Sequence, residues 1–374
     1  MARAARRPRI GVNLLVLTDR PPGGTGHHAI SLFEALIAAE LNGTTEVQIT
    51  GFATEAAAHH FSPAVRSRLV LLPSGRGSQR IANEMLRLPM AARRAGIDVV
   101  VNPAFFGAPW GSPRRALIVH DLYFRSVPHL VPRRRRLLLQ TVVPLLGRRS
   151  DTIFTVSQAT KSEMERYYPR LGARAEVLYS GNRVLPEPGD GSEGELSVPS
   201  VERPYLLMVG HLTANKSPET VIAALAALKR AGRDLKLVHI GDDAGRLAPL
   251  AVEAGVAADV VTLGSQPDSI LAACYAHCEA LVIPSIREGF GLPLIEAQAQ
   301  GAPVIASSCE ALVEIGGDSA LYFSVDSAEE CASVIRNVLD DHDQRGLLIE
   351  HGYVNAARFR WDRTATRLLE VLGL

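Results

Sequence analysis

The chain has 374 residues, of which 47% are hydrophobic and 5% aromatic, and its formal net charge is +1. This length exceeds what one hydrophobic core usually holds, so two α/β domains are expected, and the composition excludes a disordered or fibrous chain. Charge is divided unevenly: residues 1–183 carry 26 Lys and Arg against 12 Asp and Glu, and residues 184–374 carry 14 against 27. The basic first half is therefore expected to meet something anionic, such as a phosphorylated molecule or an acidic membrane surface.

Several classes of protein are not favoured. The first 17 residues join a basic run to an apolar one, as signal peptides do, but the apolar run is short and leads into Thr18-Asp19-Arg20 with no small-residue cleavage site. No stretch approaches the roughly 20 apolar residues that cross a bilayer. The four cysteines form no CxxC pair, and no zinc-finger, RNP-like or helix-turn-helix pattern indicates nucleic acid. A soluble, cytoplasmic protein without a metal site or a nucleic-acid partner is expected.

The first half alternates short apolar runs with amphipathic stretches, which predicts a parallel sheet built from strand–helix–strand crossovers. The predicted strands are, in chain order, Ile10–Leu17, Val47–Phe52, Val99–Asn102, Leu117–His120 and Thr152–Val156. The predicted helices among them are His28–Ala39, Arg133–Leu146 and Gln158–Tyr167.

Residues 184–204 interrupt this alternation and are predicted to form a linker, because prolines flank a Gly, Ser and acidic run that cannot pack a core. A second α/β alternation follows, which separates a first domain at 1–183 from a second domain that begins at residue 205. The second alternation has predicted strands at Tyr205–Val209, Leu235–Ile240, Val260–Leu263, Ala280–Ile283, Pro303–Ala306 and Ala320–Phe323, and helices at Pro218–Ala231 and Phe359–Leu374.

The most informative segment is Pro284–Gly301, PSIREGFGLPLIEAQAQG. It follows a predicted strand and reads as a Gly-containing loop and a helix, with Pro293 fitting the first helical turn and Gly301 the position just past its end. Such a helix N-terminus presents free amides and partial positive charge at the carboxyl edge of the sheet, where open α/β sheets bind ligands, and this suits a diphosphate. Gly289 and Gly291 would let the backbone approach that ligand closely.

Two glutamates, Glu288 and Glu296, flank this predicted phosphate site. Carboxylates accept hydrogen bonds from sugar hydroxyls, so the pair suggests a polyol on each side of the phosphate. Alternatively, Glu288 is simply solvated and Glu296 only favours the start of the helix. The residue types alone leave both interpretations open.

The segment resembles the E-x7-E signature of the family 4 glycosyltransferases of the GT-B fold. The match covers Glu288, Gly289, Phe290, Gly291, Leu292, Pro293, Glu296 and the following Gly301-Ala302-Pro303-Val304. The resemblance implies two Rossmann-like domains that face each other across a cleft, with a C-terminal helix that crosses back to the N-terminal domain. The expected domains are therefore 1–183 plus 359–374 and 205–358. It implies that Glu288 contacts the hydroxyls of the donor sugar and Glu296 the nucleotide ribose, while the backbone between them holds the sugar and phosphates.

Two further stretches resemble the same family. Gly23 and Gly24, after Pro22, are similar to its N-terminal Gly-Gly loop, which approaches the diphosphate from the opposite domain. His120 and Asp121 close a strand and resemble its His-Asp motif, in which the His lies near the donor sugar. Without the resemblance, a His-Asp pair is more simply a structural hydrogen bond.

Val209–Lys216 resembles the family loop in which a Lys, usually with an Arg, neutralises the donor diphosphate. Lys216 is in the expected place, whereas His211 and Asn215 stand where Arg is common. One fixed cation in place of two weakens leaving-group stabilisation, unless a protonated His211 or Arg287 compensates. Without the resemblance, Lys216 is an ordinary solvated lysine.

The resemblance implies a retaining hexosyltransferase that uses a nucleotide diphosphate sugar and a hydroxyl acceptor, and that needs no metal or other cofactor. GDP-mannose is the first guess for the donor, because the N-terminal pattern is most similar to bacterial mannosyl- and related transferases. A glycan, a lipid-linked intermediate and a natural product all remain open as acceptor. Lys216 and the amides of Leu292–Leu294 are expected to hold the diphosphate, and Glu288 and His120 to orient the sugar.

Three other functions fit parts of the sequence. A catalytically weak sugar-nucleotide-binding paralogue is suggested by the altered Lys loop, and a GT-B sugar-nucleotide epimerase shares the architecture. A dehydrogenase is disfavoured, because no G-x-G-x-x-G follows the first strand. The run Arg133–Arg136 is either a solvated helix face or a site that docks an anionic acceptor or the inner face of a membrane.

Overall fold

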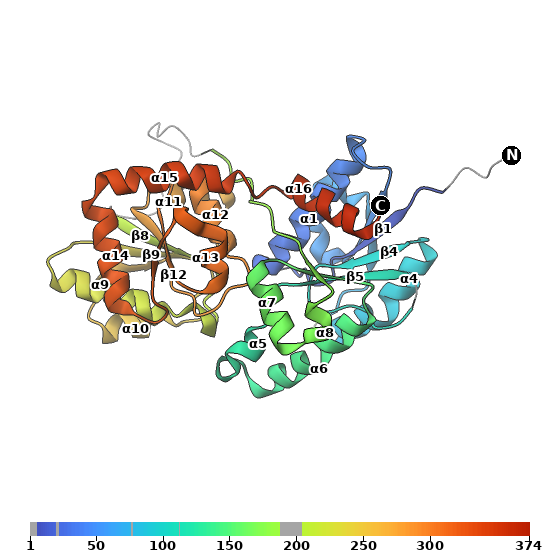
Figure 1. The fold of residues 1–374 in the computed structure, drawn as a ribbon, viewed down its shortest axis with the longest axis horizontal. Coiled ribbons are helices and arrows are strands. Elements are labelled where there is room, and N and C mark those ends of the chain that lie inside the picture. Colours follow the sequence, from blue (N-terminus) through green and yellow to red (C-terminus); the bar gives the residue numbers. More distant parts are fainter. Residues whose placement is uncertain (1–5, 20–21, 76–77, 112, 188–203) are drawn as a thin grey trace. The chain divides into compact units, whose positions relative to one another are not determined.

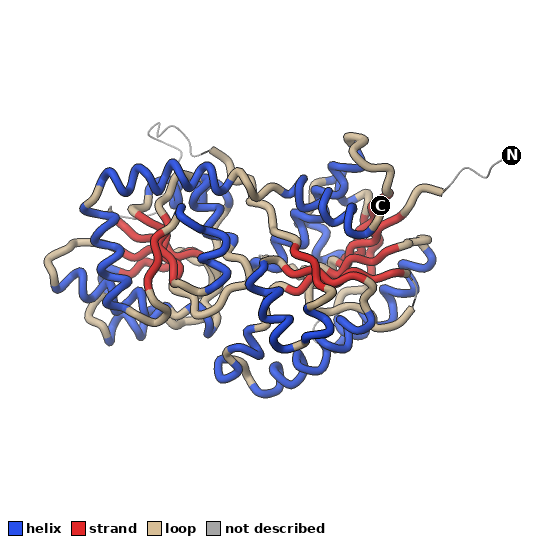
Figure 2. Tube along the Cα trace, in the orientation of Figure 1, coloured by secondary structure: helices blue, strands red, loops and turns tan. Residues whose placement is uncertain are grey.

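The computed structural model describes residues 6–19, 22–75, 78–111, 113–187 and 204–374. The chain divides into two compact units: unit 1 is Met1–Gly181 together with Arg360–Leu374, and unit 2 is Asn182–Phe359. In each unit, helices cover both faces of a parallel sheet (Figure 1, Figure 2). Of the predicted linker at 184–204, residues 188–203 lie outside the described residues.

The described part of unit 1 contains a seven-stranded sheet in the order β3-β2-β1-β4-β5-β6-β7, parallel throughout. Its strands are β1 (Arg9–Asn13), β2 (Gln48–Thr54), β3 (Leu69–Leu72), β4 (Val99–Asn102), β5 (Arg114–Val119), β6 (Thr152–Thr155) and β7 (Ala175–Val177). Its helices are α1 (Gly24–Leu41), η1 (Glu55–His60), α2 (Pro63–Arg66), α3 (Ser78–Ala82), the π-helical η2 (Asn83–Arg87), α4 (Leu88–Arg94), α5 (Tyr123–Ser126), η3 (Pro128–Leu130), α6 (Arg133–Arg149), α7 (Gln158–Tyr167), α8 (Pro169–Gly172) and α16 (Trp361–Leu372).

Unit 2 repeats the plan with a six-stranded sheet among its described residues, in the order β10-β9-β8-β11-β12-β13. Its strands are β8 (Tyr205–Val209), β9 (Lys236–Ile240), β10 (Val260–Thr262), β11 (Ala280–Ile283), β12 (Val304–Ser307) and β13 (Leu321–Phe323). Its helices are η4 (Ala214–Lys216), α9 (Pro218–Arg230), α10 (Leu247–Glu253), η5 (Ala257–Asp259), α11 (Asp268–His277), α12 (Leu292–Ala299), α13 (Glu310–Gly316), η6 (Gly317–Ser319), α14 (Ala328–Asp340) and α15 (His342–Ala356).

The central strands are buried along their whole length, as parallel strands covered on both faces must be. All four residues of β4, of β11 and of β12 are buried. In unit 2, β8 pairs with β11 in the register Leu206 to Ala280 and Leu207 to Leu281. This buried pair lies at the centre of the sheet, so the loops that follow β8 and β11 start side by side.

The apolar runs predicted most of the strands. All eleven predicted strands are present, with ends that differ by a few residues, whereas the edge strands β3 and β7 were not predicted. The helix ends predicted for α12 are confirmed: Pro293 is in the first turn and Gly301, at φ +76°, follows the C-terminus. Within the described residues, none of the helices combines the length and the apolar character needed to span a bilayer.

The strand order reverses at one place in each sheet, between β1 and β4 in unit 1 and between β8 and β11 in unit 2. Loops that leave the two strands on either side of such a switch point diverge to opposite faces and open a crevice at the carboxyl edge, where ligands bind in this class of sheet. In unit 2 these are the loop after β8, which contains Lys216, and the loop after β11, which contains Glu288. The two segments singled out in the second half of the sequence therefore meet at the switch point.

Candidate functional site

Lys216 and Glu288 are brought together from loops that are 72 residues apart in the sequence. The ammonium of Lys216 donates to Glu288 Oε1, and the two side chains are 22% and 12% exposed. Ser285, which is fully buried at the end of β11, donates its hydroxyl to the same carboxylate oxygen at 2.8 Å. Two donors thus fix one oxygen of Glu288, and charge-assisted hydrogen bonds of this kind hold a side chain firmly.

Asn215 ties the two loops together through its backbone and its side chain. Its carbonyl accepts from the amide of Ile286 at 2.8 Å, and its Nδ2 donates to the carbonyl of Arg287 at 2.9 Å. The side chain of Asn215 therefore joins the loop that contains Lys216 to the loop that contains Glu288. This role in the fold explains why an asparagine stands next to Lys216.

The backbone next to Lys216 is held in an uncommon conformation. Ser217 has φ +37° and Asp326 has φ +62°, both in the left-handed region that non-glycine residues seldom adopt. The hydroxyl of Ser217 donates to Asp326 Oδ1 at 2.7 Å, so the two positions support each other. Strained backbone of this kind is concentrated at binding sites, and here it directly follows Lys216 in the chain.

Helix α12 begins directly after the Glu288 loop and leaves amides free there. Gly291 caps the helix at φ +90°, and a Cβ at this position would lie 2.5 Å from Leu312 Cδ2, so only glycine fits. Among the described residues, the amides of Gly291 and Leu292 have no acceptor. This corrects the expectation for Leu294: its amide donates to the Gly291 carbonyl at 2.9 Å, and Pro293 has no N–H.

Glu296 lies on α12, one turn beyond these amides. It is only 5% exposed, and its Oε2 accepts from the hydroxyl of Tyr275 on α11 at 3.0 Å. Burial raises the pKa of Glu296, and the nearby charge of Arg183 and the Tyr275 hydroxyl oppose that shift. Sequence reasoning missed Tyr275, because nothing in its own segment distinguishes it from other apolar residues of a buried helix.

Phe290 packs away from solvent, so that only its backbone remains for a ligand. Its ring is 5% exposed and contacts Phe359 edge to face, with ring centroids 5.5 Å apart. Gly289 precedes it in the same loop.

His211 follows Gly210 at the end of β8, next to the buried His239, whose Nε2 lies 2.9 Å from the Gly210 carbonyl.

In unit 1, His120 follows β5 in a fixed orientation. Its Nε2 lies 2.7 Å from the carbonyl of Pro103, and burial lowers its pKa to about 4. The ring is therefore neutral near pH 7, and because a carbonyl only accepts, Nε2 must carry the hydrogen. Nδ1 then has the lone pair and can accept a hydrogen bond.

A second histidine, His28 on α1, supports this ring and was not predicted. It is 1% exposed, and its ring meets those of His120 and Trp361 edge to face at 4.7 and 5.1 Å. Its Nδ1 lies 2.9 Å from the hydroxyl of Ser180. The start of α16 thus forms part of the wall behind His120. Its contacts join segments up to 333 residues apart, which local patterns do not reveal.

The predicted Gly-Gly pair stands at the start of α1. Gly23 is the N-cap in an extended conformation, and Gly24 is the exposed first residue of the helix. A Cβ on Gly24 would meet nothing within 4 Å, so protein packing does not require glycine there. The prediction for Gly24 therefore stays that glycine is needed there so that a ligand can approach the backbone closely.

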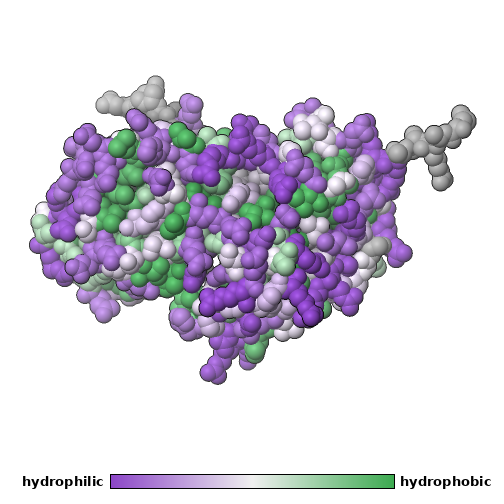
Figure 3. All heavy atoms as spheres, viewed as in Figure 1, coloured by the Kyte–Doolittle hydropathy of each residue, from purple (hydrophilic) through white to green (hydrophobic). Residues whose placement is uncertain are grey.

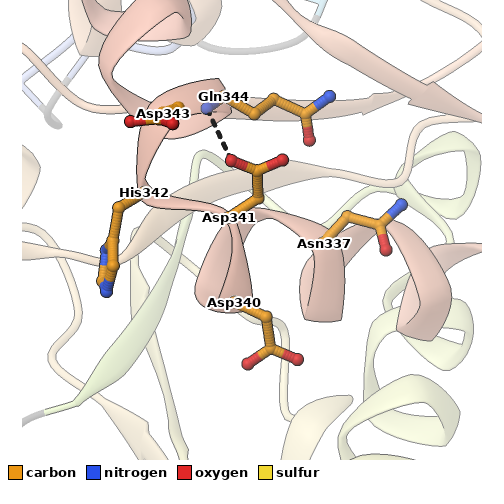
Figure 4. Close-up of a pocket in the computed structure, with 6 residues that line it drawn as sticks. All are labelled: Asn337, Asp340, Asp341, His342, Asp343 and Gln344. Atoms are coloured by element: carbon orange, nitrogen blue, oxygen red, sulfur yellow. Dashed lines mark hydrogen bonds between the residues drawn. The ribbon is translucent and has the colours of Figure 1, made fainter.

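An acidic depression at the junction of α14 and α15 is not part of this site (Figure 4). Its side chains point in different directions, and two of its aspartates have structural partners: Asp341 caps α15 by accepting from the amide of Gln344 at 2.9 Å, and Asp340 pairs with Arg233 at 2.7 Å. In the described part of the chain, no group of three or more His, Cys, Asp or Glu is arranged to hold a metal ion.

Comparisons with known proteins find relatives of both halves of the chain. A family model described as Glycosyltransferase Family 4 matches residues 22–182, and one described as Glycosyl transferases group 1 matches residues 197–354. The D-inositol 3-phosphate glycosyltransferase of Corynebacterium urealyticum is 27% identical over 277 residues, which cover 70% of this chain and 64% of that protein. The enzyme of the same description from Nocardia farcinica is 33% identical over 242 residues, or 61% of this chain and 49% of that one. Such matches thus span about half to two thirds of the curated relatives.

Solved structures share the fold along nearly the whole chain. Sucrose-phosphate synthase of Thermosynechococcus elongatus superposes with a TM-score of 0.77 at 20% identity and covers 98% of both chains. Anabaena Alr3699/HepE in complex with UDP and glucose gives a TM-score of 0.76 at 17% identity, over 98% of this chain and 100% of that one. The two parallel-sheet units are those of a GT-B glycosyltransferase. The chain belongs to the family 4 glycosyltransferases, with its group 1 region following the Family 4 region.

Proposed function

We propose that this chain transfers a hexose from a nucleotide diphosphate sugar to an acceptor hydroxyl, with retention of the anomeric configuration. One observation carries the proposal: the Lys216–Glu288 pair lies at the switch point of unit 2, where α12 begins and where the amides of Gly291 and Leu292 have no acceptor in the part of the chain that the structure describes. This arrangement offers a cation and two N–H donors to a diphosphate and a carboxylate to the sugar joined to it.

In the proposed reaction, the bond between the anomeric carbon and the diphosphate oxygen breaks while the acceptor oxygen bonds to the same face of that carbon. The hydroxyl proton of the acceptor passes to the departing phosphate. Lys216 and the two amides stabilise the charge that develops on the diphosphate, so a metal ion has no part in the proposal. Glu288 and Nδ1 of His120 accept hydrogen bonds from sugar hydroxyls, and Glu296 binds the ribose.

The proposed acceptor is a phosphorylated polyol, and the donor is either a UDP- or a GDP-sugar. Relatives at 27–33% identity are described as D-inositol 3-phosphate glycosyltransferases, which names an anionic acceptor. A neighbour of the same fold holds UDP and glucose, whereas the sequence favours GDP-mannose. The basic first half of the chain suits an anionic acceptor.

The test is binding followed by turnover. We expect a thermal-shift screen of UDP-, GDP- and ADP-sugars to show stabilisation of several degrees by one donor class, because ligands that bind only the folded chain stabilise it. That donor, with inositol phosphate and in EDTA, should give a glycosylated product with the donor's anomeric configuration. Binding without transfer or hydrolysis would indicate a sugar-nucleotide-binding paralogue, and a changed sugar without an acceptor would indicate an epimerase.

We also propose that helix α6 of unit 1 docks on an anionic membrane surface. Its first turn contains Arg133–Arg136 and no acidic residue, although cations at a helix N-terminus oppose the helix dipole. Three leucines beside them are exposed, Leu137 at 61%, Leu138 at 42% and Leu145 at 39%. Figure 3 shows a small hydrophobic area among hydrophilic atoms in the region where Figure 1 places α5 and α6. Arginines beside exposed leucines suit the headgroup region of an acidic bilayer.

For this surface we expect Arg133→Glu with Arg134→Glu to reduce co-sedimentation with phosphatidylglycerol vesicles about tenfold or more, since each basic residue contributes about 1 kcal/mol at such a surface. The matched control is Arg93→Glu with Arg94→Glu, two exposed arginines at the end of α4. Equal binding by both double variants, or undiminished binding to neutral vesicles, would contradict the assignment.

A further inference from the structure

Tyr275 and Glu296 form a buried hydrogen-bonded pair that joins α11 to α12 in unit 2. Tyr275 is fully buried and Glu296 is 5% exposed, and the phenol donates to Glu296 Oε2 at 3.0 Å. A carboxylate is costly to bury unless hydrogen bonds or charges compensate for the lost water. Packing alone therefore does not explain why a carboxylate, that of Glu296, is buried here.

The other oxygen of this carboxylate is unused. Within the described residues, Glu296 Oε1 has no hydrogen-bond partner. The charge of Arg183 acts on Glu296, but the Arg183 guanidinium is committed to an ion pair with Asp268 at the start of α11. Glu296 keeps 5% of its surface exposed, and its Oε1 is not among the buried side-chain atoms that lack a partner, so this oxygen is open to water and a ligand hydroxyl can replace that water.

The helix geometry shows where that oxygen can act. Leu292 and Glu296 are four residues apart on α12, so they lie on the same face of the helix. Side chains on a helix lean toward its N-terminus, which directs the Glu296 carboxylate toward the amides of Gly291 and Leu292. A group bound to Oε1 would thus be joined to, or lie beside, whatever binds those amides.

We propose that Tyr275 is a positioning residue, which holds the Glu296 carboxylate by Oε2 so that Oε1 accepts hydrogen bonds from the ribose hydroxyls of the bound nucleotide. This inference rests on the proposed function, since it deepens the role of the same site. Tyr275 itself touches no ligand. It acts by fixing the orientation of Glu296 and by keeping the carboxylate ionised.

The pH dependence of this device has a definite sign. Burial raises the pKa of Glu296, whereas Arg183 and the Tyr275 hydroxyl lower it and Asp268 raises it. Only the ionised carboxylate gives a charge-assisted hydrogen bond to ribose, so the preference for ribose is present above this pKa and is lost as the pH falls through it. Without the phenol the pKa rises further, and the preference is lost at a higher pH.

The test compares ribose with dideoxyribose. Titration calorimetry would measure the dissociation constants of UDP, GDP and ADP and those of their 2′,3′-dideoxy counterparts. The ratio of the two constants is the preference for ribose, and it would be measured for wild type, Tyr275→Phe and Tyr205→Phe between pH 5 and 8. Tyr205 is the matched control, because it is also a buried tyrosine and its hydroxyl donates to a backbone carbonyl, that of Cys274 at 2.9 Å. We expect a preference for ribose of about tenfold or more in wild type and Tyr205→Phe, and of under about threefold in Tyr275→Phe at neutral pH.

The results separate the positioning role of Tyr275 from the proposed function. An undiminished ribose preference in Tyr275→Phe, with an unchanged pH profile, overturns the positioning role while nucleotide binding itself upholds the proposed function. A wild type that binds none of the nucleotides overturns the proposed function and this inference with it. If Tyr275→Phe does not fold, Glu296→Gln replaces it: we expect its residual ribose preference to be independent of pH, and a preference that still falls with pH overturns the assignment.

Discussion

Glu288→Ala should reduce the rate of sugar transfer by about a hundredfold or more with the fold intact. The carboxylate is fixed by the hydroxyl of Ser285 and the ammonium of Lys216, and its second oxygen remains to accept from sugar hydroxyls. Hydrogen bonds to a charged group are worth about 1.5–3 kcal/mol each, so loss of one or two accounts for that factor. Steady-state kinetics with the donor identified by the thermal-shift screen measures it.

The control for this variant is Glu253→Ala, which removes an exposed carboxylate at the end of α10. We expect wild-type kinetics from it. Glu288→Gln is the informative companion, because it retains the shape but loses the charge that pairs with Lys216. Transfer at the wild-type rate by Glu288→Ala would remove this carboxylate from the site.

Lys216→Ala should weaken the binding of nucleoside diphosphate by about ten- to a hundredfold and lower kcat as well. Lys216 is the cation placed beside the free amides of α12, and a partly buried contact between an ammonium and phosphate is of the charge-assisted kind. Because its charge is needed most when the diphosphate departs, the effect on kcat should exceed that on the donor KM. Calorimetry with UDP and UMP separates the contributions: wild type should prefer the diphosphate, and the variant should lose most of that preference.

A matched control is Lys229→Ala, which removes a lysine paired with Asp259 at the other end of α9. The double variant Lys216→Ala with Glu288→Ala adds a second check. Since the two side chains are in contact, their effects should not be additive. Wild-type affinity for UDP in Lys216→Ala, or strictly additive losses in the double variant, would contradict the arrangement described here.

Much of the fold follows from local patterns, because a buried parallel strand is a short apolar run and its crossover helix is amphipathic. Ala280–Ile283 and Tyr205–Val209 begin and end as predicted. The edge strands β3 and β7 were not predicted, whereas β10 and β13, which are equally short and partly exposed edge strands, were. Shortness and edge position therefore do not explain the difference. What defines β3 and β7 in the fold is their pairing with β2 and β6, which their own residues do not show.

The sequence predicted the loop residues of the candidate site, but it did not predict the residues that hold those loop residues in place. Glu288 and Lys216 could be named because glycines and a helix start mark their segments, and the structure brings the two side chains into contact. Ser285, Tyr275 and His28 could not be named, because each acts through a partner that only the folded chain places beside it. The amide of Leu294 was assigned to the phosphate from its position in the helix, but a turn hydrogen bond to Gly291 uses it.

Helix α16 has a consequence for how the chain is made. It belongs to unit 1, where Thr364 donates to the carbonyl of Tyr179 at 2.8 Å and Trp361 packs against His28, yet it is encoded after all of unit 2. Domains of a nascent chain generally fold in the order of synthesis. Here the ribosome releases the first sheet well before the segment that finishes its wall, so unit 2 can complete its fold earlier than unit 1. The ring of His120 gains its final support only after all of unit 2 has been synthesised.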